Sequence, residues 1–224
     1  MSPNAHPRVV ALVSGGLDSL ALTAHLLGTG YRVSPLYIRC GLAWESAELG
    51  ALRRWLERLA RPGLSRLATL DMPIRSVYGP HWSLTGDRVP SFNSADAAVY
   101  LPGRNLLLLS HAAVYADRLG ISTLALGLLA GNPFGDATPR FVREWAACAG
   151  RALGRALRVL APLRRSRKAA LIRRAPALPF GLTVSCLRPR GLRHCGRCNK
   201  CAERRRAFAA AGHPDPTLYA SSSP

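Results

Sequence analysis

The sequence predicts an α/β protein, in which helices sandwich a mostly parallel sheet and a cysteine-bearing segment follows. Two observations carry this prediction. Short runs of β-branched residues alternate with amphipathic stretches of helical length, which is the pattern of strand–helix–strand units. Four of the six cysteines lie between residues 186 and 201, and such a cluster in an intracellular protein is typical of a metal site. We therefore divide the chain into an α/β domain, residues 1–175, and a metal-binding segment with a final helix, residues 176–224.

The first three strands are short and apolar, and glycine or proline follows each within a few residues. They are predicted over residues 8–13, 32–38 and 66–71. The first of them is apolar after its opening arginine, as in a parallel strand that is buried on both faces. Helices are predicted between the strands, over residues 18–27 and 44–60, because glycine or a Pro-Gly pair follows each helical stretch.

The second half of the chain continues the alternation after a long connection. Residues 72–103 are rich in proline, glycine and serine and too long for an idle connection, so we interpret them as a functional loop with short elements. Further helices are predicted over residues 105–119, 138–157, 165–175 and 200–211, and further strands over residues 121–126 and from residue 159. Residues 221–224 are expected to form a disordered tail.

The composition favours a folded intracellular protein. Hydrophobic residues make up 48% of the 224 residues and charged residues 19%, which suits a buried core and not a disordered polyelectrolyte. No apolar stretch approaches the ~18 residues of a membrane helix, and the N-terminus does not read as a secretory signal. We therefore expect a cytoplasmic location and no membrane partner.

The formal charge of +19 is concentrated in the last third of the chain. Residues 139–206 carry 19 lysines and arginines against two acidic residues. Such positive charge favours partners rich in phosphate, such as nucleotides or nucleic acid. Solvated surface arginines would give the same count, so charge alone leaves both interpretations open.

The string SGGLDS lies between the first predicted strand and the first predicted helix. Its glycines let the backbone turn sharply and approach an anion, which the free N–H groups of a helix start attract. The serines can donate hydrogen bonds, and Asp18 can cap the helix or hold Mg²⁺ beside a phosphate. The string therefore predicts a phosphate loop, although an ordinary capped turn would share some of these features. The predicted nucleotide-binding residues here are Val13, Ser14, Gly15, Gly16, Leu17, Asp18 and Ser19.

The clustered cysteines follow the spacing C-x8-C-x2-C-x2-C. Two linked C-x2-C steps place three sulfurs around one turn, and a more distant cysteine completes the tetrahedron of a closed structural Zn²⁺ site. An iron–sulfur cluster is the strongest alternative, because C-x2-C-x2-C also occurs there. We expect His194 beside the site or at the surface, and Cys40 and Cys148 outside it. The predicted metal ligands are Cys186, Cys195, Cys198 and Cys201.

Taken together, these motifs resemble a known enzyme family. SGGLDS resembles the SGGxDS signature of the PP-loop ATP pyrophosphatases, which implies a Rossmann-like fold of the HUP type and cleavage of ATP to AMP and pyrophosphate. Other segments resemble one branch of that group, the QueC or ExsB family of 7-cyano-7-deazaguanine synthases, and the resemblance extends over nearly the whole chain. These segments are Pro102-Gly103-Arg104-Asn105, Pro162-Leu163 with Lys168, and Ser185-Cys186 with the cysteine run from Cys195 to Cys201.

The resemblance implies a ligase of the queuosine pathway that converts 7-carboxy-7-deazaguanine and ammonia to the nitrile. ATP would activate first the acid and then the amide as adenylates. The implied cofactors are ATP, Mg²⁺ and a structural Zn²⁺, and a homodimer is the implied assembly.

The same resemblance assigns roles to individual residues. Asp18, Arg104 and Lys168 would act in catalysis by balancing charge on the phosphates or the carboxylate, and Asn105 would contact the nucleotide or cap its helix. Asp136 and Phe134 would hold the deazapurine. The alternative for Arg104 and Lys168 is surface charge, and the alternative for Asp136 is a loop cap.

Two segments depart from the usual pattern of that family. Where the family shows Tyr-Gly-Gln-Arg-His after the second strand, residues 40–44 read CGLAW, and where it shows Tyr-Pro-Asp-Cys-Arg, residues 134–138 read FGDAT. Both segments lie where the small substrate would be held. A PP-loop enzyme that adenylates tRNA or another acceptor, and a non-catalytic basic zinc module, therefore stand as alternatives.

Overall fold

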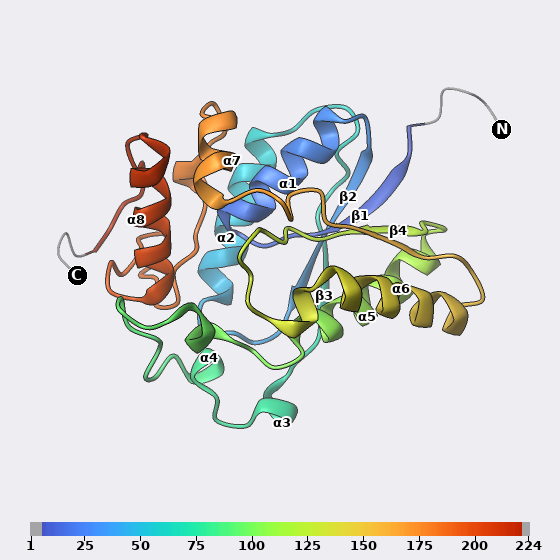
Figure 1. Ribbon diagram of the computed structural model, residues 1–224, viewed down its shortest axis with the longest axis horizontal. Helices are drawn as coiled ribbons and strands as arrows, with labels where there is room; N and C mark the ends of the chain where they lie inside the picture. The colour runs from blue at the N-terminus through green and yellow to red at the C-terminus, as the bar shows by residue number, and fades with distance from the viewer. Residues whose placement is uncertain (1–5, 221–224) are drawn as a thin grey trace.

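A computed structural model describes residues 6–220 of the chain, in which a five-stranded parallel sheet is covered by helices (Figure 1). The strand order is β3-β2-β1-β4-β5, so the chain crosses over between β3 and β4 and β1 lies at the centre. The predicted tail, residues 221–224, lies outside the described residues. The strands are β1 (Arg8–Leu12), β2 (Arg32–Arg39), β3 (Ala68–Asp71), β4 (Thr123–Ala125) and β5 (Arg158–Leu160).

Helices account for most of the remaining regular structure. No helix within residues 6–220 has the length and apolar character needed to cross a membrane. The α-helices are α1 (Leu17–Gly28), α2 (Glu45–Arg58), α3 (Arg75–Tyr78), α4 (Trp82–Thr85), α5 (Arg104–Arg118), α6 (Pro139–Ala152), α7 (Lys168–Arg174) and α8 (Asn199–Ala211). Three 3₁₀ turns are η1 (Asp96–Val99), η2 (Gly135–Ala137) and η3 (Phe180–Leu182).

The central strand shows why both faces of the sheet are covered. Val9 and Ala11 belong to a core cluster with α1, α2, α7 and α8, whereas Val10 and Leu12 belong to a cluster with α5 and α6. Alternate side chains of a strand point to opposite faces, so the continuous apolar run feeds two cores. Residues of the C-terminal segment join both clusters, through Cys201 in one and Phe208 in the other.

The predicted order of strands and helices is confirmed, with changes at the ends of several elements. The helix predicted over residues 138–157 ends at Ala152, because the chain turns at Gly154, which has a φ of +66°. The helix predicted over residues 165–175 begins only at Lys168. The connection over residues 72–103 contains only α3, α4 and η1, as its composition predicts.

Candidate phosphate and metal site

The phosphate loop joins the C-terminal end of β1 to the start of α1. Gly16 is the N-cap residue of this 12-residue helix and has no side chain to cap it. The loop is held by its serines, since Ser19 Oγ accepts a hydrogen bond from Ser14 N at 2.9 Å and Ser14 Oγ accepts one from Gly16 N at 3.2 Å. Free N–H groups at a helix start favour an anion, so the loop has the geometry that phosphate binding needs.

Two distant segments hold the loop in place. A side-chain carbon at Gly15 would lie 2.2 Å from the backbone oxygen of Glu48 on α2, so only glycine fits there. On the other side, Gly15 O accepts a hydrogen bond from Val184 N at 2.8 Å. The C-terminal segment therefore contacts the phosphate loop directly.

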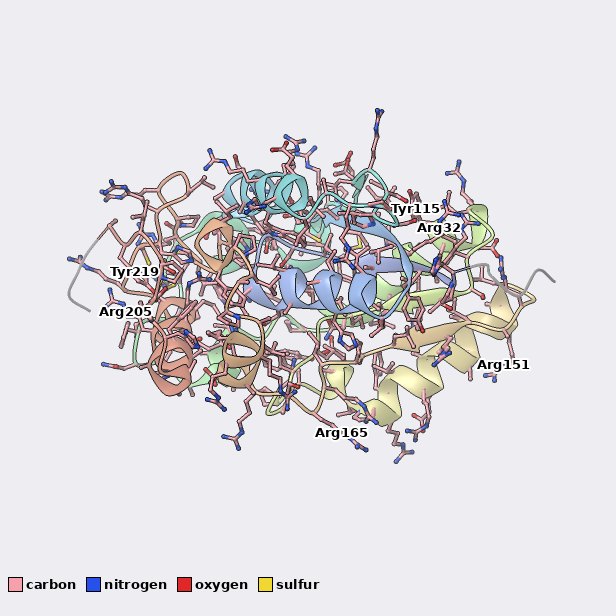
Figure 2. All side chains as sticks on the ribbon, turned by 90° about the horizontal axis from the view of Figure 1, so that it is seen from above. Arg32, Tyr115, Arg151, Arg165, Arg205 and Tyr219 are labelled. Atoms are coloured by element: carbon pink, nitrogen blue, oxygen red, sulfur yellow. The ribbon has the colours of Figure 1, made fainter. Side chains whose placement is uncertain are left out.

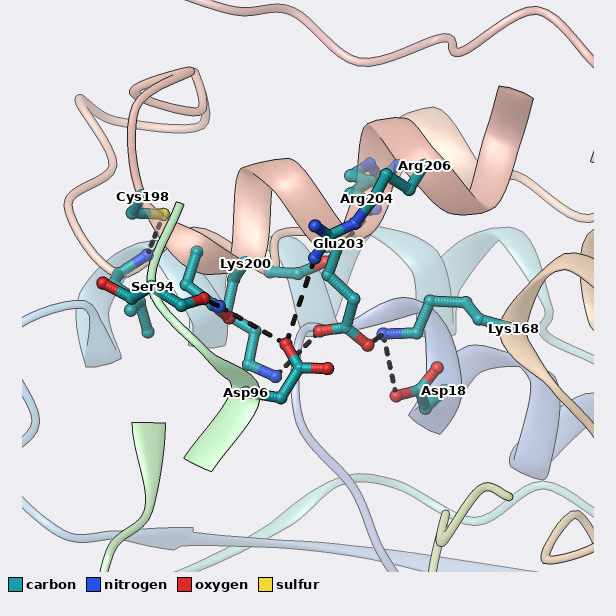
Figure 3. Close-up of polar contacts among 12 residues, drawn as sticks. Asp18, Ser94, Asp96, Lys168, Cys198, Lys200, Glu203, Arg204 and Arg206 are labelled. Atoms are coloured by element: carbon teal, nitrogen blue, oxygen red, sulfur yellow. Dashed lines mark hydrogen bonds and ion pairs between the residues drawn. The ribbon is translucent and has the colours of Figure 1, made fainter. Parts of the chain in front are cut away.

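Three charged side chains meet beside the loop (Figure 3). Asp18 and Lys168 are predicted site residues, and Glu203 is their neighbour. Lys168 Nζ lies 3.4 Å from Asp18 Oδ2 and 2.6 Å from Glu203 Oε1, with its side chain only 14% exposed. Burial by itself would lower the pKa of Lys168, but the two carboxylates outweigh it and raise that pKa above its ordinary value. The lysine therefore stays protonated and available to balance phosphate charge.

Asp18 has one carboxylate oxygen to spare. Its Oδ1 is buried and has no hydrogen-bond partner among the described residues, while Oδ2 faces Lys168. Burial raises the pKa of Asp18, and Lys168 opposes this shift. An unpartnered carboxylate oxygen beside a phosphate loop is a suitable ligand for a hard divalent cation such as Mg²⁺.

A cavity of about 210 Å³ opens in front of these groups. Asp18, Lys168 and Glu203 line it, as does the predicted substrate residue Phe134. Phe134 also stacks on Tyr100, with 4.8 Å between the ring centroids. A second cavity of about 410 Å³ shares the backbone segment 129–132 and adds Arg143, Arg164 and Arg165.

Arg104 is the first residue of α5. Its Nε is buried without a hydrogen-bond partner in residues 6–220. It faces Glu48, whose pKa is raised by burial and lowered in part by Arg104, and Glu48 Oε2 accepts a hydrogen bond from Tyr37 Oη at 2.8 Å. Cys40 is also buried near Arg104, and burial raises the pKa of its thiol to about 11. This thiol is therefore not a ready nucleophile.

Asn105 and Asp136 contact each other. Asp136 is 8% exposed, and its two oxygens accept hydrogen bonds from the backbone and side-chain nitrogens of Asn105. Gly103 is the N-cap of α5, so the expectation that Asn105 itself caps the helix is wrong. Asp136 instead caps the first turn of α5, from a position 31 residues later in the chain. A capping role is the alternative given above for Asp136.

The four predicted metal ligands come together as expected. All four Sγ atoms lie within 4.8 Å of one another, and three of the pairs are separated by 3.5, 3.9 and 4.0 Å. Four sulfurs around one Zn²⁺ at about 2.3 Å would be about 3.8 Å apart, so the set fits a tetrahedral ion. The backbone N–H groups of Leu187, Arg188, Cys195 and Arg197 donate to these sulfurs, which suits thiolates.

The other sulfur and imidazole groups separate from this cluster. Cys148 is exposed and Cys40 is buried elsewhere in the core. His194 is 1% exposed, so a surface position is ruled out, and its Nε2 accepts a hydrogen bond from Ser185 N at 3.1 Å. It therefore supports the backbone beside Cys186 and is not a member of the four-sulfur set.

The basic residues have different environments. Figure 2 shows Arg151 and Arg165 at the periphery, and Arg205 lies over the Tyr219 ring at 4.2 Å. Arg204, by contrast, is 1% exposed and donates to Thr183 Oγ1 and to the backbone oxygen of Phe180. At least one arginine of the basic segment is therefore structural.

Sequence reasoning missed Glu48 and Glu203, which flank the phosphate loop from α2 and α8. Neither residue is close to SGGLDS in the sequence, because Glu48 lies 29 residues after Ser19 and Glu203 lies 184 residues after it. The only available signal was for Glu203, which lies two residues after Cys201 in the cysteine motif. They lie beside the loop only because α2 and α8 pack there in the folded chain.

Comparisons with known proteins agree over most of the chain. A family model described as "Queuosine biosynthesis protein QueC" matches residues 8–212. The chain is 38% identical over 228 residues to a 7-cyano-7-deazaguanine synthase of Xanthomonas campestris, covering 96% of this chain and 99% of the relative. It is also 38% identical over 225 residues to a 7-cyano-7-deazaguanine synthase of Xanthomonas oryzae, covering 95% and 98%.

Solved structures support the fold. A predicted subunit of a tRNA methyltransferase from Methanocaldococcus jannaschii superposes with a TM-score of 0.51 at 16% identity, covering 75% of each chain. A 4-thiouridine synthetase in complex with RNA and ATP gives the same TM-score and identity, covering 95% of this chain and 47% of the other. At such identities the likeness concerns the α/β architecture alone.

Proposed function

The chain belongs to the QueC family of queuosine biosynthesis proteins, and we propose that it converts 7-carboxy-7-deazaguanine and ammonia to 7-cyano-7-deazaguanine with ATP. The observation that carries the proposal is the near full-length similarity to the named synthases, at 38% identity. The geometry is consistent with it, because Lys168 Nζ lies 3.4 Å from Asp18 Oδ2 beside the start of α1, which no side chain caps.

The proposed reaction forms AMP twice. The substrate carboxylate attacks the α-phosphate of ATP, pyrophosphate leaves, and ammonia then displaces AMP to give the amide. The amide oxygen attacks a second ATP in the same way, and loss of AMP with a proton leaves the nitrile. None of these steps needs a protein nucleophile, so the task of the site is to position the reactants and balance charge.

Different residues would position the reactants and balance their charge. The loop N–H groups and Ser14 and Ser19 would hold phosphate oxygens, and Lys168 would balance charge on the departing pyrophosphate. Asp18 Oδ1 would hold Mg²⁺, which when bound supplies further positive charge to the phosphates. Arg104, whose Nε has no partner among the described residues, would contact phosphate or carboxylate.

Phe134 and Asp136 would form the acceptor end of the site. Phe134 lines the cavity and can pack against a flat heterocycle. Asp136 already accepts two hydrogen bonds from Asn105, so a contact with the deazapurine would use its remaining lone pairs. The four cysteines would hold a structural Zn²⁺, and we also propose a homodimer in the cytoplasm, as the family resemblance implies.

The test follows the base and the nucleotide together. Purified protein is incubated with ATP, Mg²⁺, ammonium and 7-carboxy-7-deazaguanine, and nitrile and AMP are measured by mass spectrometry. Asp18→Asn should abolish both products, whereas the exposed Asp87→Asn should leave them unchanged. If a folded, metal-loaded protein makes no nitrile, the acceptor is wrong. AMP formation on addition of tRNA would then favour the nucleic-acid alternative, which the basic last third of the chain supports.

A further inference from the structure

Glu203 connects the metal-bearing helix to the phosphate loop. It lies on α8 two residues after Cys201 and forms part of the wall of the 210 Å³ cavity. Its two carboxylate oxygens are used separately: Oε1 contacts Lys168 Nζ at 2.6 Å and Oε2 contacts Lys200 Nζ at 2.7 Å (Figure 3). One carboxylate thus holds two ammonium groups that line the same cavity.

The charges around Lys168 explain why such a residue is needed. Lys168 and Lys200 carry like charges into a partly desolvated cavity, where their repulsion is weakly screened. With Asp18 and Glu203 the four groups sum to zero, and Lys168 is held between the two carboxylates. Without Glu203, Lys168 would keep only the 3.4 Å contact with Asp18 and would be pushed from that position by Lys200.

The helix that carries Glu203 is fixed on both sides of it. Cys198 and Cys201 bracket its first turn and belong to the four-sulfur cluster. Asn199 Nδ2 donates to Ser94 O at 2.7 Å, and buried Arg204 contacts the segment that precedes Cys186. A carboxylate on so constrained a helix turn can set the position of a flexible lysine from another helix.

We propose that Glu203 is a positioning residue, which holds Lys168 against Asp18 and makes phosphate binding depend on the metal-bearing helix. The proposal rests on the proposed role of the phosphate loop but not on the identity of the acceptor. It assigns to the four-cysteine segment a second consequence besides folding, namely the alignment of a lysine that lies 35 residues before Glu203 in the chain.

The test is a double-mutant cycle with inorganic pyrophosphate as the probe. Calorimetry with Mg²⁺ present measures its dissociation constant for the wild type, Glu203→Gln, Lys168→Met and the double variant. Each single variant should bind about 10-fold more weakly, and the double variant should bind no more weakly than Lys168→Met, because coupled residues are non-additive. Glu144→Gln, which removes one partner of an exposed ion pair with Arg140, is the control and should bind as the wild type does.

Bound metal and the thermal unfolding midpoint are measured for every variant. If Glu203→Gln does not fold, Glu203→Asp retains the charge on a shorter side chain and should also weaken binding. Unchanged or tighter pyrophosphate binding in a folded Glu203→Gln would overturn the proposal, because Glu203 would then only compete with phosphate for Lys168. An equal loss in the presence and absence of Lys168 would overturn it too. Because the probe needs no acceptor, a failure to make the nitrile leaves this result interpretable.

Discussion

The carboxylate of Asp136 caps helix α5 through Asn105, with 2.9 Å to the backbone nitrogen and 3.2 Å to the side-chain nitrogen. The contact joins η2 to the helix that begins at Arg104. It therefore links the loop after β4 to the helix whose first residue, Arg104, interacts with Glu48. A negative charge also interacts favourably with the N-terminus of a helix.

Asp136→Ala should lower the free energy of unfolding by about 1–2 kcal/mol, because it removes a charged cap from the first turn of α5. Urea unfolding followed by circular dichroism measures the change. Asp87→Ala, an exposed aspartate in a turn, is the control. A loss of activity with no loss of stability would instead show that Asp136 acts mainly on the substrate.

Gly15→Ala should destabilise the protein far more than Gly135→Ala, because of the two only Gly15 lies against another part of the backbone. The new carbon would lie 2.2 Å from the Glu48 backbone oxygen, so the loop must move away from α2. We expect a loss of at least about 2 kcal/mol in unfolding free energy and much weaker pyrophosphate binding. Gly135→Ala, where nothing lies within 4 Å, should unfold and bind as the wild type does.

Cys198→Ser should release the metal and destabilise α8, because a site of four thiolates loses one ligand. The expected loss is at least about 3 kcal/mol of unfolding free energy, with less than one metal ion per chain by elemental analysis. A chelator should have the same effect on the wild type. Cys148→Ser removes an exposed thiol outside the cluster and should retain both metal and stability. Brown colour in the purified protein would indicate iron–sulfur in place of zinc.

Glu48→Gln should change how stability depends on pH. Burial raises the pKa of Glu48 above its ordinary value of 4.5, against the opposing effects of Arg104 and Tyr37. The folded state therefore binds this proton more tightly than the unfolded state. Its contribution is fully present below pH 4.5 and is lost as the pH rises toward the raised pKa.

Glutamine cannot lose that proton, so the stability of Glu48→Gln relative to the wild type should increase as the pH rises above 4.5. Urea unfolding at several pH values between about 4 and 7 measures the difference. Glu57→Gln, on the exposed face of α2, is the control and should show no such trend. A difference that is constant with pH would contradict the assignment.

SGGLDS and the cysteine cluster could be predicted from the sequence, because the chemistry of each depends on residues at short, fixed spacings. SGGLDS requires only a strand before it and a helix after it, and the structure places β1 and α1 there. The four cysteines are close in sequence, so their convergence follows from two short turns. The order of strands and helices followed from the alternation of apolar runs, although the ends of α6 and α7 did not.

The sequence by itself determined the order of strands and helices, the turn at SGGLDS between β1 and α1, and the clustering of the four cysteines, because each of these follows from patterns over short stretches of the chain. The tertiary structure alone decided which side chains meet across long separations. It brought Glu203 to Lys168 and Glu48 to Gly15, and it turned Asp136 toward Asn105. These contacts depend on how α2, α5, α7 and α8 pack around the sheet, and packing is set by the shape of the whole core and not by any local pattern.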